Sequence, residues 1–301
     1  MNKIIPEFFL NRLNKAYGEN LSNKIIDGYV SSKKVTLRVN TLKATKEEVI
    51  KAFNDNNIIY QEVDFYNDAF IIDNVKENDL WKLDIYNEGK IYLQSLSSML
   101  PPLFLDIDES SHILDMAAAP GGKTTQMAAL TSNKACITAC ELNPLRAEKL
   151  KHNVDKLGAT RTNVMVKDAR QLDEFMRFNK ILLDAPCSGS GTLDLTNEKT
   201  FVYFTDKLIE KSTKAQLALI KKGIQILSKG GTMIYSTCSI LPSENEEILK
   251  QILKTGKVKI EPIEIKTSLP LELLPTTIDG VICVKPNEYF EGFFISKLIK
   301  L

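Results

Sequence analysis

Two cysteines stand in turns that could carry covalent chemistry. Cys187 lies in the segment LLDAPCSGSGT and Cys238 in the segment IYSTCSI, each after an apolar run that predicts a strand. Both turns are rich in serine, glycine or threonine, whereas a cysteine packed inside an element is usually inert. Nearby cations or a helix N-terminus lower the pKa of a thiol from about 8.5 and favour the nucleophilic thiolate. One such thiol could add to an electron-poor ring while a second group removes a proton.

This pair of thiols suits the methylation of cytosine at carbon 5. That carbon is not nucleophilic until a thiolate adds at carbon 6, and loss of the carbon 5 proton after methyl transfer would expel the thiolate. A carboxyl group near ring nitrogen 3 would help by donating a proton or a hydrogen bond. The tetrapeptide DAPC lacks the second proline and the aromatic residue typical of enzymes that methylate exocyclic amines. The residue types alone do not decide which cysteine attacks the ring.

The segment LDMAAAPGGKTT, residues 114–125, joins a predicted strand to a predicted helix. Its Gly122-Lys123-Thr124 matches the end of the P-loop pattern G-x-x-x-x-G-K-[ST]. However, Ala117 stands where that pattern has its first glycine, and Pro120 lacks the backbone N–H that a phosphate-binding loop uses. A P-loop nucleotide hydrolase therefore stays an alternative from a different class of protein.

Acidic residues end the neighbouring predicted strands, at Asp115, Glu141, Asp168 and Asp184. Glu141 lies about 20 residues beyond the glycines, where dinucleotide-type folds place a carboxylate for ribose hydroxyls. Phosphate binding gives Glu141 no role, whereas a ribose-bearing ligand does. S-adenosylmethionine is a nucleoside that carries a sulfonium instead of phosphates, and the helix N-terminus after Gly122 could bind its carboxylate. The pattern favours S-adenosylmethionine over ATP.

The elements that must position these residues alternate between strand and helix from about residue 110. This alternation predicts a doubly wound α/β domain, a Rossmann-like parallel sheet with ligands outside the carboxyl ends of its strands. The last two strands are expected to close the sheet as a hairpin-like pair. Strands are predicted over 112–117, 135–141, 163–168, 180–186, 231–238, 258–265 and 291–301, and helices over 122–131, 143–158, 206–231 and 243–254.

Before residue 90 the elements are shorter and predict a small N-terminal α+β module. Domains are therefore expected over 1–90 and 91–301, the first as an RNA-binding module and the second as the catalytic domain. Lys33, Lys34 and Arg38 could face RNA phosphates or could form an ordinary solvated face. Trp81 is expected to pack in a core or an interface.

Composition limits the partners. The net charge of the 301 residues is only +1, so a nucleic-acid surface must be a local patch. No apolar run reaches membrane-spanning length, and the N-terminus carries charges too early for a signal peptide. Five scattered cysteines predict no disulfide framework and favour a reducing, cytoplasmic setting for a monomer. The remaining cysteines are expected to be buried, and no metal site is expected from them or from the histidines, at Cys136, Cys140, Cys283, His112 and His152.

The chain resembles a known family. The motifs AAAPGGKT, DAPCSGSG, YSTCSI followed by PSENEE, and the terminal EGFFISKL are similar to those of Sun/Nop-type (RsmB-like) RNA cytosine-C5 methyltransferases. The match covers about residues 90–301, and LRVNTLKAT and YLQSLSSMLPP extend it into the N-terminal module. The resemblance implies a class I methyltransferase that forms 5-methylcytosine in RNA with S-adenosylmethionine.

The resemblance also implies roles for individual residues. Glu141 would hold the ribose and Asp168 the adenine, while Asp184 would lie between the cofactor and the target base. Cys238 would be the nucleophile, and Cys187 would help to release the product. The loop that binds S-adenosylmethionine would consist of Ala117, Ala118, Ala119, Pro120, Gly121, Gly122 and Lys123.

The chain departs from the family at two places that bear on how it would bind RNA. Arginines often follow the SGSGT loop in the family, where this chain has LDLTNEK, and Pro286-Asn287 stands in place of a proline-histidine pair. The chain resembles the short archaeal-type members that act on tRNA. We therefore expect tRNA as the substrate, with rRNA as the alternative. Because both Cys187 and Cys238 are present, a non-catalytic RNA-binding protein is disfavoured.

Overall fold

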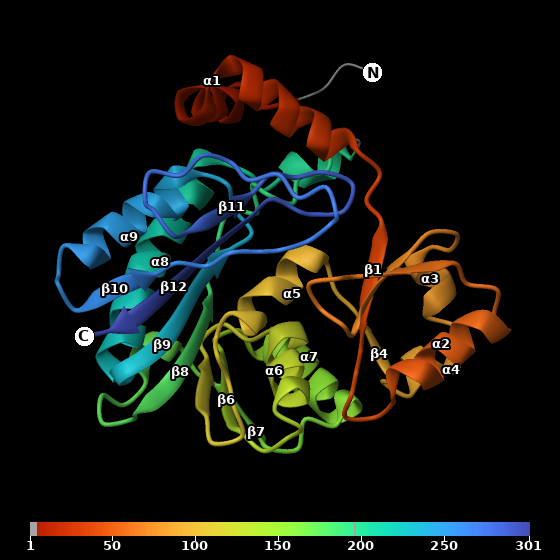
Figure 1. Cartoon of the computed structure of the whole chain (residues 1–301). Coiled ribbons are helices and arrows are strands. Elements are labelled where there is room, and N and C mark those ends of the chain that lie inside the picture. The colour runs from red at the N-terminus through yellow and green to blue at the C-terminus, as the bar shows by residue number, and fades with distance from the viewer. Residues whose placement is uncertain (1–4, 196) are drawn as a thin grey trace.

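A computed structural model describes residues 5–195 and 197–301. Its largest feature is a mixed sheet with the strand order β10-β12-β9-β8-β5-β6-β7, as Figure 1 shows. The five strands from β9 to β7 in this order run parallel, and β12 is antiparallel to β9 and to β10. Its strands are β5 (His112–Asp115), β6 (Cys136–Glu141), β7 (Thr162–Val166), β8 (Phe178–Asp184), β9 (Leu227–Thr237), β10 (Val258–Glu261), β11 (Ile282–Val284, paired with β12) and β12 (Phe293–Lys300).

The strand order reverses between β5 and β8, because β6 lies on one side of β5 and β8 on the other. Ligands bind doubly wound sheets at such a reversal, outside the carboxyl ends of the strands. The predicted doubly wound fold is confirmed. The expected closing pair is also found, since β10 and β12 pair antiparallel from Val258 opposite Lys300 to Glu261 opposite Lys297.

Helices cover both faces of the large sheet. One apolar core lies against α8 and α9 and includes Ile220, Leu249 and Tyr235, whereas the other lies against α5, α6 and α7 and includes Met99 and Leu150. The helical elements are α5 (Leu96–Leu103), α6 (Gly122–Leu130), α7 (Pro144–Leu157), η1 (Ala169–Gln171), η2 (Glu198–Phe201), α8 (Asp206–Ile226), η3 (Pro242–Glu244) and α9 (Glu246–Leu253).

The boundary predicted at residue 231 between the long helix and the next strand is wrong. Helix α8 ends at Ile226, and the two glycines at 230 and 231 lie inside β9. Leu227 has an extended backbone, is fully buried and pairs with Phe178 of β8. Because Leu227 is buried and paired with β8, the helix ends before it, and Gly230 and Gly231 belong to the strand.

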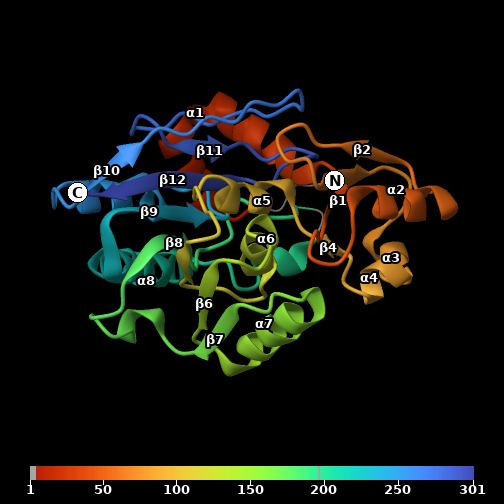
Figure 2. The ribbon, with the colours of Figure 1, turned by 60° about the horizontal axis from the view of Figure 1, so that its bottom comes forward.

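The N-terminal module contains a four-stranded antiparallel sheet of order β2-β3-β1-β4. Helix α2 begins with a capping box, in which Thr45 and Glu48 exchange hydrogen bonds. Figures 1 and 2 both show this module beside α5 and α6. Its elements are β1 (Val35–Val39), α2 (Lys46–Asp55), β2 (Tyr60–Glu62), β3 (Ala69–Ile72), α3 (Glu77–Leu80), α4 (Asp84–Asn87) and β4 (Ile91–Leu93).

Helix α1 (Glu7–Val30) packs against the larger domain and shares its apolar core. It is broken at Gly18, whose φ of 74° favours glycine. The ring of Phe9 lies 5.0 Å from that of Phe204, and Arg12 forms an ion pair with Asp206 at the start of α8. The first helix therefore shares its core with the larger domain, and the division at residue 90 stays a prediction.

Candidate active site

A cavity of about 640 Å³ lies between the N-terminal module and the carboxyl ends of β5, β8 and β9. The module contributes Lys33, Lys34 and Trp81 to its wall, and β12 contributes Phe293. The cavity therefore joins the strand ends that the sequence singled out to the predicted RNA-binding module. The predicted site residues along its wall are Ala117, Ala118, Ala119, Pro120, Gly122, Lys123, Asp184 and Cys238.

The loop between β5 and α6 is fixed by its backbone. The N–H of Ala118 donates to the carbonyl oxygen of Cys140 in β6, at 2.9 Å. Gly121 precedes the first residue of α6 with a φ of 110°, which only glycine adopts readily, and a Cβ there would lie 3.1 Å from Leu150. The hydrogen bond of Ala118 and the conformation of Gly121 therefore fix the loop backbone beside the cavity, directly before α6.

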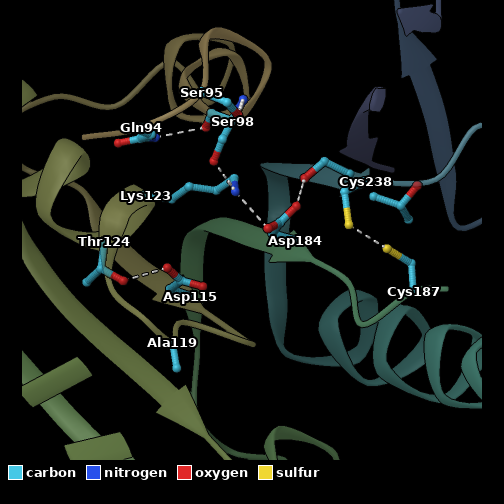
Figure 3. A network of polar contacts seen from close by, with 12 residues as sticks. Gln94, Ser95, Ser98, Asp115, Ala119, Lys123, Thr124, Asp184, Cys187 and Cys238 are labelled. Carbon is cyan, nitrogen blue, oxygen red and sulfur yellow. Dashed lines mark hydrogen bonds and ion pairs between the residues drawn. The ribbon is translucent and has the colours of Figure 1, made fainter. Parts of the chain in front are cut away.

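Lys123 is held by side chains of the protein (Figure 3). Its Nζ lies 2.7 Å from Oδ2 of Asp184 and donates to Oγ of Ser98, also at 2.7 Å. Ser236 donates to the other Asp184 oxygen at 2.8 Å. Although burial alone lowers the pKa of Lys123, the Asp184 carboxylate raises it above its ordinary value. A P-loop lysine instead reaches for phosphate, so this ion pair disfavours the hydrolase alternative.

Asp115 has one oxygen bonded and one free. Thr124 donates to Oδ2 at 2.7 Å, whereas Oδ1 is buried without a partner among the described residues. Burial raises the pKa of Asp115 to about 6. Because buried polar atoms are nearly always paired, an acceptor left open on the cavity wall fits a ligand that brings its own donor. The ammonium group of S-adenosylmethionine is such a donor.

Glu141 and Asp168 lie at the ends of the next two strands, outside the wall of this cavity. Oε1 of Glu141 accepts from the N–H of Asn143 at 2.8 Å, and Arg146 lies 3.6 Å from Oε2. Asp168 accepts three hydrogen bonds from the Arg170 guanidinium, which hold the pKa of Asp168 below its usual range. A second hollow of about 550 Å³ adjoins these strand ends and is lined by Leu142, Arg170, Pro186, Lys207, Glu210, Lys211, Lys214 and Ala215.

The structure brings Cys187 and Cys238 together at the ends of β8 and β9. Their Sγ atoms lie 2.9 Å apart, and both cysteines are free. The hydrogen bond to Cys238 raises the pKa of the Cys187 thiol, and burial and the Glu244 carboxylate raise it further. Cys238 lines the cavity, whereas Cys187 lies outside its wall. The two thiols are thus close in space, but only Cys238 lies on the wall of the cavity.

Arg38 is buried, so both sequence interpretations are wrong for this residue: it can neither face RNA phosphates nor form part of a solvated face. It is 0% exposed and donates to Oε1 of Gln94 at 2.9 Å, to the carbonyl oxygen of Gly122 at 2.9 Å and to Thr125 at 2.8 Å. Arg38 lies on β1, a central strand of the small sheet, and its side chain extends into the contact with α6. It links the module to the helix that follows the cofactor loop.

Two further expectations of burial are wrong. Trp81 is not packed in a core: it is 46% exposed and lies on the cavity wall, because it follows the short helix α3 at the module's surface, and its packing in an interface stays a prediction. Cys136 was expected to be buried, but it is exposed at the first position of β6 and accepts from the Arg161 guanidinium at 2.8 Å.

Sequence reasoning gave no role to Ser98, Ser236 or Glu244, all of which contact predicted site residues or the turns beside them. Ser236 and Glu244 fall within the quoted motifs YSTCSI and PSENEE, which was the available signal. Among residues 5–195 and 197–301, no three His, Cys, Asp or Glu side chains are grouped to hold a metal ion. None of the helices described in those ranges has the length and apolarity to cross a membrane.

Comparisons with known proteins agree with this geometry. The family model described as 16S rRNA methyltransferase RsmB/F matches residues 102–299, and one described as an RsmF/B-like ferredoxin-like domain matches residues 5–77. Ribosomal RNA small subunit methyltransferase F of Shewanella woodyi is 34% identical, over 97% of this chain and 63% of its own length. Probable ribosomal RNA small subunit methyltransferase B of Bacillus subtilis is 30% identical, over 98% of this chain and 66% of its own length. The chain thus spans slightly less than two thirds of these relatives.

Solved structures show the same fold over the whole chain. A methyltransferase homologue from Pyrococcus horikoshii has a TM-score of 0.84 at 29% identity, covering 99% of this chain and 96% of that one. NSun6 from Pyrococcus horikoshii, solved with SFG, has a TM-score of 0.86 at 23% identity, covering 100% and 99%. The predicted family and cofactor class are confirmed by the family match. The chain belongs to the RsmB/F family of S-adenosylmethionine-dependent RNA methyltransferases.

Proposed function

We propose that this protein forms 5-methylcytosine in RNA through a covalent bond between a cysteine and the target base. The observation that carries the proposal is the pair of thiols 2.9 Å apart, beside an aspartate that an internal lysine and a serine hold in place. Neither phosphate transfer nor simple RNA binding gives a role to two adjacent cysteines, one of which lines the cavity.

Bound S-adenosylmethionine would supply the methyl group as an electrophile. The loop from Ala117 to Lys123 would hold the methionine part, with the open oxygen of Asp115 accepting from its ammonium group. Glu141 would accept from the ribose hydroxyls, and Asp168 would contact the adenine. Since these two acids adjoin the second hollow, the cofactor would extend from the main cavity toward it.

Cys238 would be the nucleophile because it lines the cavity that a base can enter. Its thiolate would add to carbon 6 and move the ring electron pair to carbon 5, and carbon 5 would then take the methyl group as the sulfur–methyl bond of the cofactor breaks and S-adenosylhomocysteine leaves. Asp184 would lie beside the ring edge, where its carboxyl group, once protonated, would donate a hydrogen bond to nitrogen 3 and stabilise the added charge. Removal of the carbon 5 proton then restores the double bond and returns the electron pair to the sulfur of Cys238.

Cys187 would serve this last step. Its largest pKa-raising contact is the hydrogen bond to Cys238, so the thiol stays protonated while Cys238 is free and can donate to the attacking thiolate. Once Cys238 is bonded to carbon, that contact is lost, and Cys187 would give its proton to solvent water. Its thiolate can then receive the proton that leaves carbon 5.

Two classes of RNA, tRNA and rRNA, are candidates for the substrate. The resemblance in sequence favours tRNA, whereas the curated relatives carry the names of rRNA methyltransferases. We propose tRNA as the first substrate and rRNA as the second. We also propose a monomer that acts in the cytoplasm, because five free cysteines suit a reducing compartment. Sedimentation velocity would test the monomer.

Two measurements test the proposed function. Calorimetry with S-adenosylmethionine, S-adenosylhomocysteine and ATP should show binding of the first two and none of ATP. Bisulfite sequencing of tRNA and rRNA incubated with the protein should reveal a protected cytosine, which should be absent with Cys238→Ala. Tight binding of ATP without S-adenosylmethionine binding, or no protected cytosine in either RNA, would contradict the proposal.

A further inference from the structure

One buried carboxylate is bonded to both cysteine-bearing turns. Glu244, at the end of η3, is 0% exposed. Its Oε1 accepts from the N–H of Ser188 at 2.7 Å, and its Oε2 accepts from the hydroxyl groups of Ser188 at 2.5 Å and of Ser239 at 2.6 Å. Ser188 directly follows Cys187, and Ser239 directly follows Cys238. A single side chain thus ties together the two turns that carry the thiols.

Other contacts hold the same two turns in register. The hydroxyl groups of Ser190 and Ser239 lie 2.7 Å apart, and the N–H of Gly191 donates to the carbonyl oxygen of Cys238 at 2.9 Å. The backbone of Glu244 is itself fixed, because the Tyr235 hydroxyl donates to its carbonyl oxygen at 2.5 Å. The Glu244 carboxylate adds a third link between the two turns, from a residue that lies in neither of them.

Burying the carboxylate of Glu244 destabilises the folded protein. Burial raises the pKa of Glu244, while the hydrogen bonds from Ser188 and Ser239 oppose that rise. None of the ion pairs among the described residues includes Glu244, so neutral donors alone compensate its charge. A buried charge without a cationic partner destabilises a fold, and a site of this kind is expected where function requires it.

We propose that Glu244 is a positioning residue that holds the thiols of Cys187 and Cys238 side by side for the covalent reaction. This inference rests on the proposed function. Both sulfurs must reach the same ring, one at carbon 6 and the other near the proton on carbon 5. A displacement of about 1 Å at such a site costs on the order of 100-fold in rate. Glu244 touches neither substrate nor cofactor and acts through the two turns.

Two substitutions separate the geometry from the charge. Glu244→Gln keeps an oxygen for the N–H of Ser188, and its amide group can donate to the two serine hydroxyls, so the turns stay tied. Glu244→Ala removes the acceptor of all four donors, the N–H and hydroxyl of Ser188, the hydroxyl of Ser239 and the amide of Gln216. We expect Glu244→Ala to lower kcat about 100-fold with the KM for S-adenosylmethionine within about twofold, and Glu244→Gln to recover most of that loss.

A second readout follows the thiols themselves. Phenylarsine oxide bonds to two neighbouring thiols at once, with loss of one water molecule, and so reports whether the sulfurs are adjacent. Wild type and Glu244→Gln should bind one equivalent, whereas Glu244→Ala and the control Cys187→Ala should bind none. This measurement needs no RNA and no methyl transfer.

The outcomes are distinguishable. Wild-type kcat and full arsenical capture in Glu244→Ala would overturn the inference, as would equal damage by Glu244→Gln and Glu244→Ala when both are folded. Thermal unfolding checks the fold. If Glu244→Ala does not fold, the double variant Ser188→Ala/Ser239→Ala takes its place, and unchanged kcat in it would overturn the inference. Capture that depends on Glu244 in a protein that methylates no cytosine would refute only the proposed function.

Discussion

At the scale of single residues, Asp115 connects stability to ligand binding. Burial raises its pKa from 3.8 to about 6, so the folded state favours the protonated acid. A pKa unit corresponds to about 1.4 kcal/mol, and the charged form therefore destabilises the fold by about 3 kcal/mol well above pH 6. This penalty shrinks as pH falls through 6 and is lost below the unfolded value of about 3.9.

Asp115→Asn removes that charge. We expect the free energy of unfolding to rise at pH 8, by up to about 3 kcal/mol, and the gain to shrink toward pH 4. Affinity for S-adenosylmethionine should fall, because the open carboxylate oxygen is lost. Denaturant titrations at both pH values and calorimetry measure these changes. Asp108→Asn is the control, since hydrogen bonds from Ser110 lower the pKa of exposed Asp108 and predict no gain. An equal effect of Asp115→Asn at both pH values would refute the burial argument.

At the scale of elements, the ends of β6 and β7 carry the predicted contacts to the nucleoside. Glu141→Ala and Asp168→Ala should each weaken S-adenosylmethionine binding about 10- to 100-fold and leave RNA binding nearly unchanged, because a hydrogen bond to a charged group contributes about 1.5–3 kcal/mol. Glu148→Ala, on the exposed face of α7, is the matched control. Calorimetry gives the affinities. If both variants bind the cofactor as wild type does, these strand ends have been assigned wrongly.

The elements also show what the sequence can and cannot predict. Alternating strands and helices predicted the sheet, and the sheet placed Cys187 and Cys238 on neighbouring strands, because parallel strands end at one edge. The partners of buried polar groups were not predictable in this way. Arg38 donates to Gly122, 84 residues away, and Glu244 meets Ser188, 56 residues away. Such contacts depend on how separate elements pack, which no local pattern encodes.

At the scale of the whole molecule, the cavity lies between the module and the large sheet, and its shape restricts the substrate. Cys238 must approach carbon 6 from above the ring plane, which stacking in a duplex prevents. A folded tRNA or rRNA fragment with an unpaired target cytosine should therefore react at least about tenfold faster than the same sequence in a perfect RNA duplex, since flipping a paired base costs a few kcal/mol. Tritium transfer from labelled S-adenosylmethionine measures both rates. Equal rates would show that the base need not leave its stack.

The central claim is that the two cysteines act at opposite ends of one reaction. Cys238→Ala removes the nucleophile and blocks entry to the pathway, whereas Cys187→Ala blocks only the exit. On a denaturing gel with RNA and S-adenosylmethionine, we expect Cys187→Ala to accumulate a slow covalent RNA–protein band and Cys238→Ala to form none. A band in Cys238→Ala alone would make Cys187 the nucleophile. Full activity and no band in both variants would contradict the covalent mechanism itself.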